Sequence, residues 1–209
     1  EDHSRLEWFK QVRVLTSRYL QITLADSRKL ALLFAQPFVI FLLICLVFTY
    51  PTNMAFMAAV AIFWVGCTNA AREIVRERSV YRRERKVNLS ISPYVLSKVG
   101  VIAAISVLQV FIATVVLKMA GGLPGSVPAM VGILLAAALG GMALGLAISA
   151  FAARPEHADS LVPIAVIPQI IFAGVIEGLH TMNGPSRLVS TITSTRWSFD
   201  GLMCVLRGT

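Results

Sequence analysis

The chain has 209 residues, of which 56% are hydrophobic and only 14% are charged. A soluble domain of this length carries about a quarter charged residues, and here the apolar residues are gathered into long uncharged runs. This pattern excludes a disordered segment, a disulfide-bonded secreted domain and a soluble enzyme. The three cysteines, Cys45, Cys67 and Cys204, have no metal-binding or redox spacing. The composition therefore predicts an all-α membrane protein, a polytopic bundle of transmembrane helices.

The amino-terminal segment, residues 1–29, is predicted to be a cytoplasmic helix that lies in the membrane interface and leads into the first span. Five apolar residues recur in it at spacings of three and four, which places them on one helical stripe: Trp8, Val12, Leu15, Tyr19 and Ile22. We expect this stripe to contact the acyl boundary of the bilayer. The alternative is a stripe that packs on a soluble domain.

Five runs in residues 30–177 have the apolar character of membrane spans. A hydrocarbon core of about 30 Å requires roughly 20 apolar residues in a helix, and the runs are 30–50, 54–71, 99–117, 127–152 and 161–176. The fifth is short and contains Pro163 and Pro168, which predicts a kinked or broken helix. In the fourth, Gly141 and Gly145 predict a close helix contact, either at a dimer seam or within one chain.

The distribution of basic residues orients these spans. Segments 1–29, 72–98 and 153–160 hold 15 of the 19 Lys and Arg residues. Because basic loops stay on the cytoplasmic side, we expect a multi-pass protein of the cell membrane with its amino end in the cytoplasm.

The loop between the second and third spans, residues 72–98, is the most informative segment. It holds eight basic residues together with Glu73, Glu77 and Glu84, and its apolar residues continue the helical period of the second span. Binding of anionic lipid head groups explains the cations, but it gives no role to the glutamates, which favour a docking surface for a cytoplasmic partner. We expect no nucleic-acid partner, because no aromatic platform accompanies the charge.

The order of these parts resembles the transmembrane domain of G-subfamily ATP-binding-cassette exporters, within the type-2 permease group. The resemblance covers nearly the whole chain and is most specific in two places, the Arg-Glu-Arg-Ser-Val-Tyr-Arg-Arg-Glu-Arg loop at 76–85 and Phe172-Ala173-Gly174. The chain is most similar to bacterial members that begin with forkhead-associated domains and an ATPase domain. Two departures from the family pattern are the lack of a sixth span and of a phosphate-binding loop.

The resemblance implies roles for three groups of residues. Those that would couple the chain to an ATPase domain are Glu77, Arg78, Tyr81, Arg82, Arg83 and Glu84. Those near a substrate pathway would be Ile62, Phe63, Val65, Cys67, Ile167, Ile170 and Ile171, and those at an extracytoplasmic gate would be Val175 and Ile176. Gln169 joins the pathway group on its own chemistry, because it is a polar residue inside a span and follows a proline that frees a backbone carbonyl.

The resemblance also implies a homodimer in contact with membrane lipids, with ATP and Mg²⁺ bound by a separate or fused ATPase domain. Residues 178–209 would then be an extracytoplasmic loop that leads to a missing sixth helix, and the chain would be part of a longer polypeptide. The cargo expected from apolar pathway residues is amphipathic or lipid-like. Two alternatives remain open: an intramembrane enzyme for lipid head groups that uses Glu177, His180 and Asp200, and a lipid-binding membrane scaffold.

Overall fold

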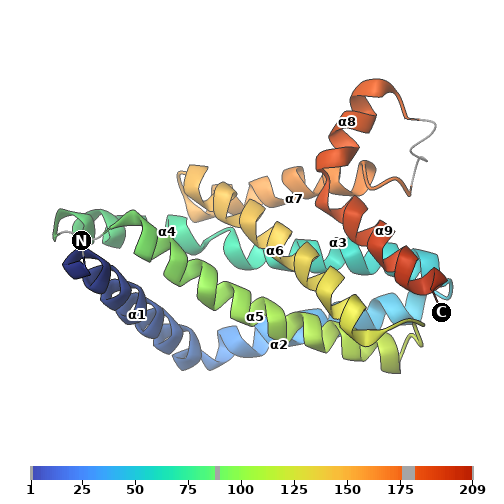
Figure 1. The fold of residues 1–209 in the computed structure, drawn as a ribbon, viewed down its shortest axis with the longest axis horizontal. Coiled ribbons are helices and arrows are strands. Elements are labelled where there is room, and N and C mark those ends of the chain that lie inside the picture. The colour runs from blue at the N-terminus through green and yellow to red at the C-terminus, as the bar shows by residue number, and fades with distance from the viewer. Residues whose placement is uncertain (1, 88–89, 176–181, 209) are drawn as a thin grey trace.

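The computed structural model describes residues 2–87, 90–175 and 182–208, which form a bundle of helices without a strand in that part of the chain (Figure 1). Helix α1, α4 and the start of α5 lie at one end, and α9 lies toward the other. The helices are α1 (Asp2–Ala25), α2 (Ser27–Val47), α3 (Pro51–Ala70), α4 (Glu73–Glu84), the 3₁₀ turn η1 (Arg85–Val87), α5 (Ile91–Met119), α6 (Val127–Phe151), α7 (Pro155–Ile171), α8 (Gly184–Ile192) and α9 (Ser194–Arg207). The predicted all-α membrane architecture is confirmed.

Four helical segments in the described part are long and apolar enough to cross a membrane: α2, α3 with its continuation α4, α5 and α6. They coincide with the first four predicted spans. The fifth predicted span corresponds to α7, which has 17 residues and falls short of that length. Pro163 and Pro168 both lie inside this one helix, so the helix is not broken at either proline.

Helices α3 and α6 approach each other so closely that backbone meets backbone. A Cβ atom added at Gly141 would overlap the carbonyl oxygen of Phe63, and one added at Gly145 would overlap the carbonyl oxygen of Cys67. On the facing helix, a Cβ atom at Gly66 would overlap the carbonyl oxygen of Ala138. Small residues permit this approach, and van der Waals packing then holds the helices together where no hydrophobic force acts. Gly141 and Gly145 therefore serve packing within one chain.

A hydrogen-bond chain through the apolar layer links α2, α5 and α3. Pro37 lies inside α2 and has no N–H group, so the Leu33 carbonyl four residues earlier loses its usual helical donor. The Gln109 side chain of α5 replaces that donor, with Nε2 2.8 Å from the Leu33 oxygen. Asn69 of α3 in turn donates to Gln109 Oε1 at 2.7 Å. A proline defect in one helix is thus satisfied by a polar residue of another.

The apolar stripe of α1 packs on α5. We had expected it to face the acyl boundary of the bilayer, and this prediction was wrong. Leu15 and Tyr19 are buried, and Tyr19 packs with Val101 and Ile102 of α5. Only Ile22, at the end of the stripe, is well exposed. The reason is that the start of α5 offers a complementary apolar surface, which a stripe read from the sequence alone cannot identify.

The carboxyl-terminal segment forms two helices, α8 and α9, where a loop was predicted for residues 178–209. Helix α9 packs against α3 and α6. Its Leu202 is fully buried in the core that these two helices share, and Phe199 meets Phe56 of α3 edge to face, with ring centroids 5.9 Å apart. This segment therefore completes the bundle at the end opposite α4.

Gly141→Ala is expected to destabilise the protein, because the added methyl group would force α3 and α6 apart. Overpacking of this kind costs about 1–3 kcal/mol, so the midpoint of thermal unfolding in detergent should fall. Gly132→Ala is the matched control, since a Cβ atom there meets nothing within 4 Å. Equal losses for the two variants would contradict the close contact.

Gln109→Leu should cost about 1 kcal/mol, the scale of an interhelical hydrogen bond in a membrane, because it leaves the Leu33 carbonyl without a donor. Pro37→Ala restores an N–H group to α2 and should reduce this cost. A double-mutant cycle of the two changes, measured by unfolding in detergent, should therefore show coupling. Additive effects would mean that Gln109 and the N–H at position 37 do not serve the same carbonyl.

Candidate functional site

Helix α4 is fixed to the carboxyl end of α6 by two hydrogen-bonding exchanges. The Ser149 hydroxyl oxygen accepts the backbone N–H groups of Ile74 at 2.9 Å and Val75 at 3.0 Å, in the first turn of α4. In return, Arg78 of α4 donates to the carbonyl of Ala150 at 2.6 Å, in the last turn of α6. Each helix thus satisfies backbone groups that the other helix end leaves unpaired. The two helix dipoles also meet with opposite signs.

A second group of contacts centres on Lys98, whose side chain is 3% exposed. Its Nζ lies 2.6 Å from Glu77 Oε1 and 3.8 Å from Glu73 Oε2, and 3.6 Å from the centre of the Tyr19 ring. Lys29 pairs with the other oxygen of Glu73 at 3.2 Å. We call Tyr19, Lys29, Glu73, Glu77 and Lys98 the charged cluster; it brings together residues of α1, α2, α4 and α5.

The Tyr19 hydroxyl donates a hydrogen bond of 2.5 Å to Glu73 Oε2. Burial, and next the nearby Glu73 carboxylate, raise the pKa of this hydroxyl above its ordinary value. Tyr19 therefore keeps its proton and remains a donor at physiological pH. The charged cluster needs that proton, because without it Glu73 would keep only its ion pairs with Lys29 and Lys98.

Further along α4, two contacts hold its carboxyl end. Glu84 pairs with Arg18 of α1 at 2.7 Å, and the ring of Tyr81 lies 4.7 Å from that of Tyr94 in α5. Three of the predicted coupling residues, Glu77, Tyr81 and Glu84, thus face the protein's own α1 and α5.

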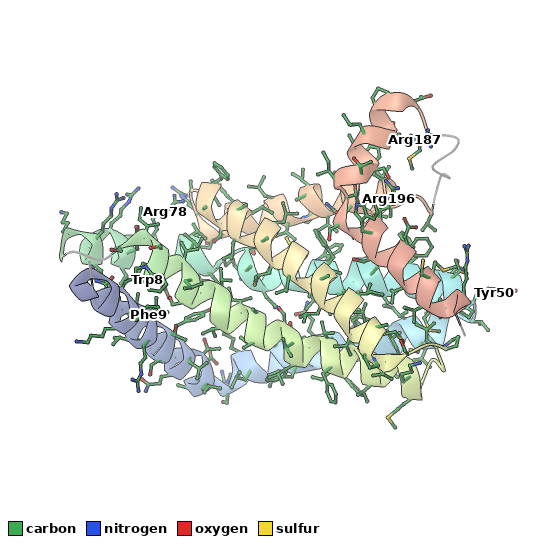
Figure 2. All side chains as sticks on the ribbon, viewed as in Figure 1. Trp8, Phe9, Tyr50, Arg78, Arg187 and Arg196 are labelled. Atoms are coloured by element: carbon green, nitrogen blue, oxygen red, sulfur yellow. The ribbon has the colours of Figure 1, made fainter. Side chains whose placement is uncertain are left out.

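The other side of α4 is strongly basic. Arg82 and Arg83 are exposed, and a surface cavity of about 500 Å³ is lined by Arg78, Tyr81, Arg82, Arg85, Lys86, Ile74 and Ala150. Figure 2 shows Arg78 at the same end of the molecule as Trp8. The Nε1 atom of Trp8 donates a hydrogen bond of 3.0 Å to the Ser92 hydroxyl of α5. The sequence motif thus divides into an inner side with the glutamates and an outer basic side, and Tyr81 contacts both.

The predicted pathway residues fall into two groups. In α3, Ile62, Phe63, Val65 and Cys67 are all fully buried in the chain's own core. Phe63 and Cys67 pack in a cluster with residues of α6 and α7. In α7, Ile167 and Ile171 are about half exposed, while Ile170 and Gln169 are partly buried. Ile170 packs against the cluster that contains Phe63 and Cys67, so the two groups meet at this residue, and the pathway assignment stays a prediction.

Gln169 and Val175, one of the two predicted gate residues, lie at or just after the end of α7. Gln169 Oε1 accepts the backbone N–H of Thr195 at 3.3 Å in the first turn of α9, and the Thr195 hydroxyl donates to the Gln169 carbonyl at 2.5 Å. Gly174 has a φ of 82°, a left-handed conformation that glycine adopts without strain. Val175 packs with Phe56 and Val60 of α3. Ile176 lies outside the described residues.

Of the three residues of the enzyme alternative, Asp200 lies in the described part of the chain. Asp200 lies 3.6 Å from Arg196, one helical turn earlier in α9, and Glu177 and His180 lie outside the described residues. In the ranges that the structure describes, no group of three or more His, Cys, Asp and Glu residues could hold a metal ion.

These features define a polytopic membrane protein in which a short, highly charged helix, α4, is fixed to α2, α5 and α6 by hydrogen bonds and ion pairs. Residues 10–206 match the family described as ABC-2 type transporter, and the chain belongs to this family of transporter membrane domains. It is 28% identical over 224 positions to the ABC transporter ATP-binding/permease protein Rv1747 of Mycobacterium tuberculosis. The match covers 95% of this chain but only 25% of that relative, so the chain spans about a quarter of its length.

The family and the relative identify this chain as the permease part of a transporter, as the resemblance in its sequence predicted at the coarser level. The G-subfamily relation and the forkhead-associated domains stay predictions. Sequence reasoning missed Lys98 and Ser149 as parts of the site. Lys98 carried a signal, because a lysine at the start of an apolar run must find a partner, whereas a serine near the end of an apolar helix carries none.

Lys98→Met should destabilise the protein strongly, because it leaves Glu73 and Glu77 facing each other in a poorly hydrated site. Removing one member of a buried pair costs about 3–5 kcal/mol, which thermal unfolding in detergent would reveal. Arg72→Met is the matched control, since the side chains of the Arg72–Asp159 pair are 45% and 51% exposed and an exposed pair contributes about 1 kcal/mol or less. Similar losses in both variants would show that Lys98 does not hold the cluster together.

Proposed function

We propose that this chain is the membrane-spanning permease part of an ATP-driven exporter, in which α4 receives the motion of an ATPase domain. The observation that carries the proposal is the double attachment of α4. Its amino end is capped by Ser149 of α6, and its inner face is paired through Glu77 with Lys98 of α5. A helix held in this way passes a displacement to the spans instead of bending at its joints.

The basic side of α4 is the surface that we assign to the ATPase domain. Arg82 and Arg83 are exposed there, next to the cavity lined by Arg85 and Lys86. The partner surface should therefore carry acidic side chains. The ATPase domain would bind ATP and Mg²⁺, and the name of the relative supports such a domain, because that protein is an ATP-binding/permease protein. Its fusion to the amino end of this permease is part of the proposal.

In this mechanism two copies of the permease form a homodimer in the cell membrane, with α1 and α4 on the cytoplasmic side. Closure of the two ATPase domains would push on α4, and the spans would switch the pathway from an inward-facing to an outward-facing state. The 15 basic residues of the cytoplasmic segments support this orientation.

The cargo that we propose is amphipathic or lipid-like. The exposed face of α7 offers Ile164, Ile167 and Ile171 and no charge over that stretch, so it suits an apolar chain and has no cation for a small anion. The buried residues of α3, Ile62 to Cys67, would join the pathway only if α3 and α6 move apart. Val175 and Ile176 would close its outer end.

Arg82→Glu combined with Arg83→Glu in the full-length protein should uncouple ATP hydrolysis from transport, because it reverses the charge that the ATPase domain is expected to contact. In reconstituted vesicles, transport of a fluorescent phospholipid should fall at least about tenfold, the effect of 1.4 kcal/mol, while basal ATP hydrolysis persists.

Lys10→Glu combined with Arg13→Glu is the matched control, since both residues are exposed cations on α1 and the change in net charge is the same. Transport should survive in this variant. Unchanged transport in the Arg82 and Arg83 variant would refute the assignment of α4.

A further inference from the structure

A groove of about 730 Å³ lies between the first half of α2 and the junction of α3 with α4. Its rim carries Arg28, Lys29, Arg72 and Arg76 against only two carboxylates, Asp26 and Glu73, which gives the rim a formal charge of +2. This groove is separate from the cavity beside the basic side of α4.

Two of the four cations remain available at the rim. Lys29 pairs with Glu73 at 3.2 Å, and Arg72 pairs with Asp159 of α7 at 3.2 Å. Arg28 and Arg76 are exposed and form no ion pair within the described residues. They approach the groove from different helices, so an anion between them would contact both α2 and α4.

Below the charged rim, the wall of the groove is formed by apolar and amide side chains of α2. Leu32 is 71% exposed and Leu33 lines the same wall. Gln36 also lines it, and its partly buried side chain makes no hydrogen bond to the described residues. At 1.5 Å per residue, Gln36 lies about 12 Å along the helix from Arg28. An amide at that depth in a bilayer requires a polar partner.

We propose that this groove binds an anionic glycerophospholipid from the leaflet at the charged end of the bundle. Arg28 and Arg76 would hold the phosphate, Gln36 would donate to an ester carbonyl, and an acyl chain would lie along Leu32 and Leu33. The order from cation to amide and leucines follows the order of phosphate, ester and chain in such a lipid. A soluble protein domain would reach the rim but not the leucines. The proposal is independent of the ATPase and the cargo.

The full-length protein in nanodiscs tests this site. Phosphatidylglycerol, added to a phosphatidylcholine bilayer, should raise the thermal unfolding midpoint and remain bound in native mass spectrometry. Arg28→Gln combined with Arg76→Gln should weaken binding about 25-fold, because each basic side chain near an anionic membrane surface contributes about a factor of five. Lys10→Gln combined with Arg13→Gln removes the same charge outside the groove and should retain binding.

Gln36→Leu tests the lower part of the groove without a change of charge and should also weaken binding. Arg28→Lys combined with Arg76→Lys keeps the charge and should retain most of the affinity, which separates a binding defect from misfolding. Equal losses in the Lys10 and Arg13 control would overturn the proposal in favour of general surface charge. Equal stabilisation by glycerol 3-phosphate would identify a free-phosphate site, and no preference for phosphatidylglycerol would refute a lipid site.

Discussion

The backbone contact of α3 with α6 is the constraint on which the rest of the molecule depends. Gly66, Gly141 and Gly145 let the two helices approach until carbonyl oxygens of one helix lie against glycine Cα atoms of the other. This register places the end of α3 beside the end of α6. Helix α4, which follows α3 after a short turn, therefore begins next to Ser149. A shift between the two helices would remove the cap and the position of α4 together.

Polar groups in this protein serve as joints between helices. Gln109 satisfies a carbonyl that Pro37 leaves without a donor, and Gln169 contacts the first turn of α9. Lys98 does the same with charge, since it binds carboxylates of α4 while lying against Tyr19 of α1. In a bilayer an unpaired polar group is costly, so each of these residues fixes a specific neighbour. Apolar packing alone is less selective.

Features that depend on local sequence could be predicted well. The bounds of α2, α3 and α6 follow closely from hydropathy, whereas α5 begins at Ile91, well before the apolar run predicted to start at residue 99. The helical course of α4 follows from the period of its apolar residues. What covers a surface could not be predicted. The stripe of α1 with Leu15 and Tyr19 is real, but the sequence does not reveal that α5 covers it. Gly141 and Gly145 likewise predicted a close contact without identifying α3 as the partner.

In the candidate site too, the segment could be predicted from the local sequence but its packing partners could not. The motif around Glu77 and Glu84 predicted a docking segment, because glutamates among arginines have no role at a lipid surface. Their partners, Lys98 and Arg18, are 21 and 66 residues away in the chain, and only the folded bundle brings them together. The burial of Phe63 and Cys67 could not be predicted either, since both faces of α3 are apolar.

The cap on α4 also dictates an order of assembly. Ser149 follows Ile74 by 75 residues, so the ribosome must make α5 and nearly all of α6 before the amino end of α4 can be closed. Until then, the first N–H groups of α4 remain hydrated and the helix is free to fray. The cap on α4 therefore forms late in biogenesis. In a nascent chain arrested before Ser149, the amino end of α4 would lack its hydrogen-bond acceptor.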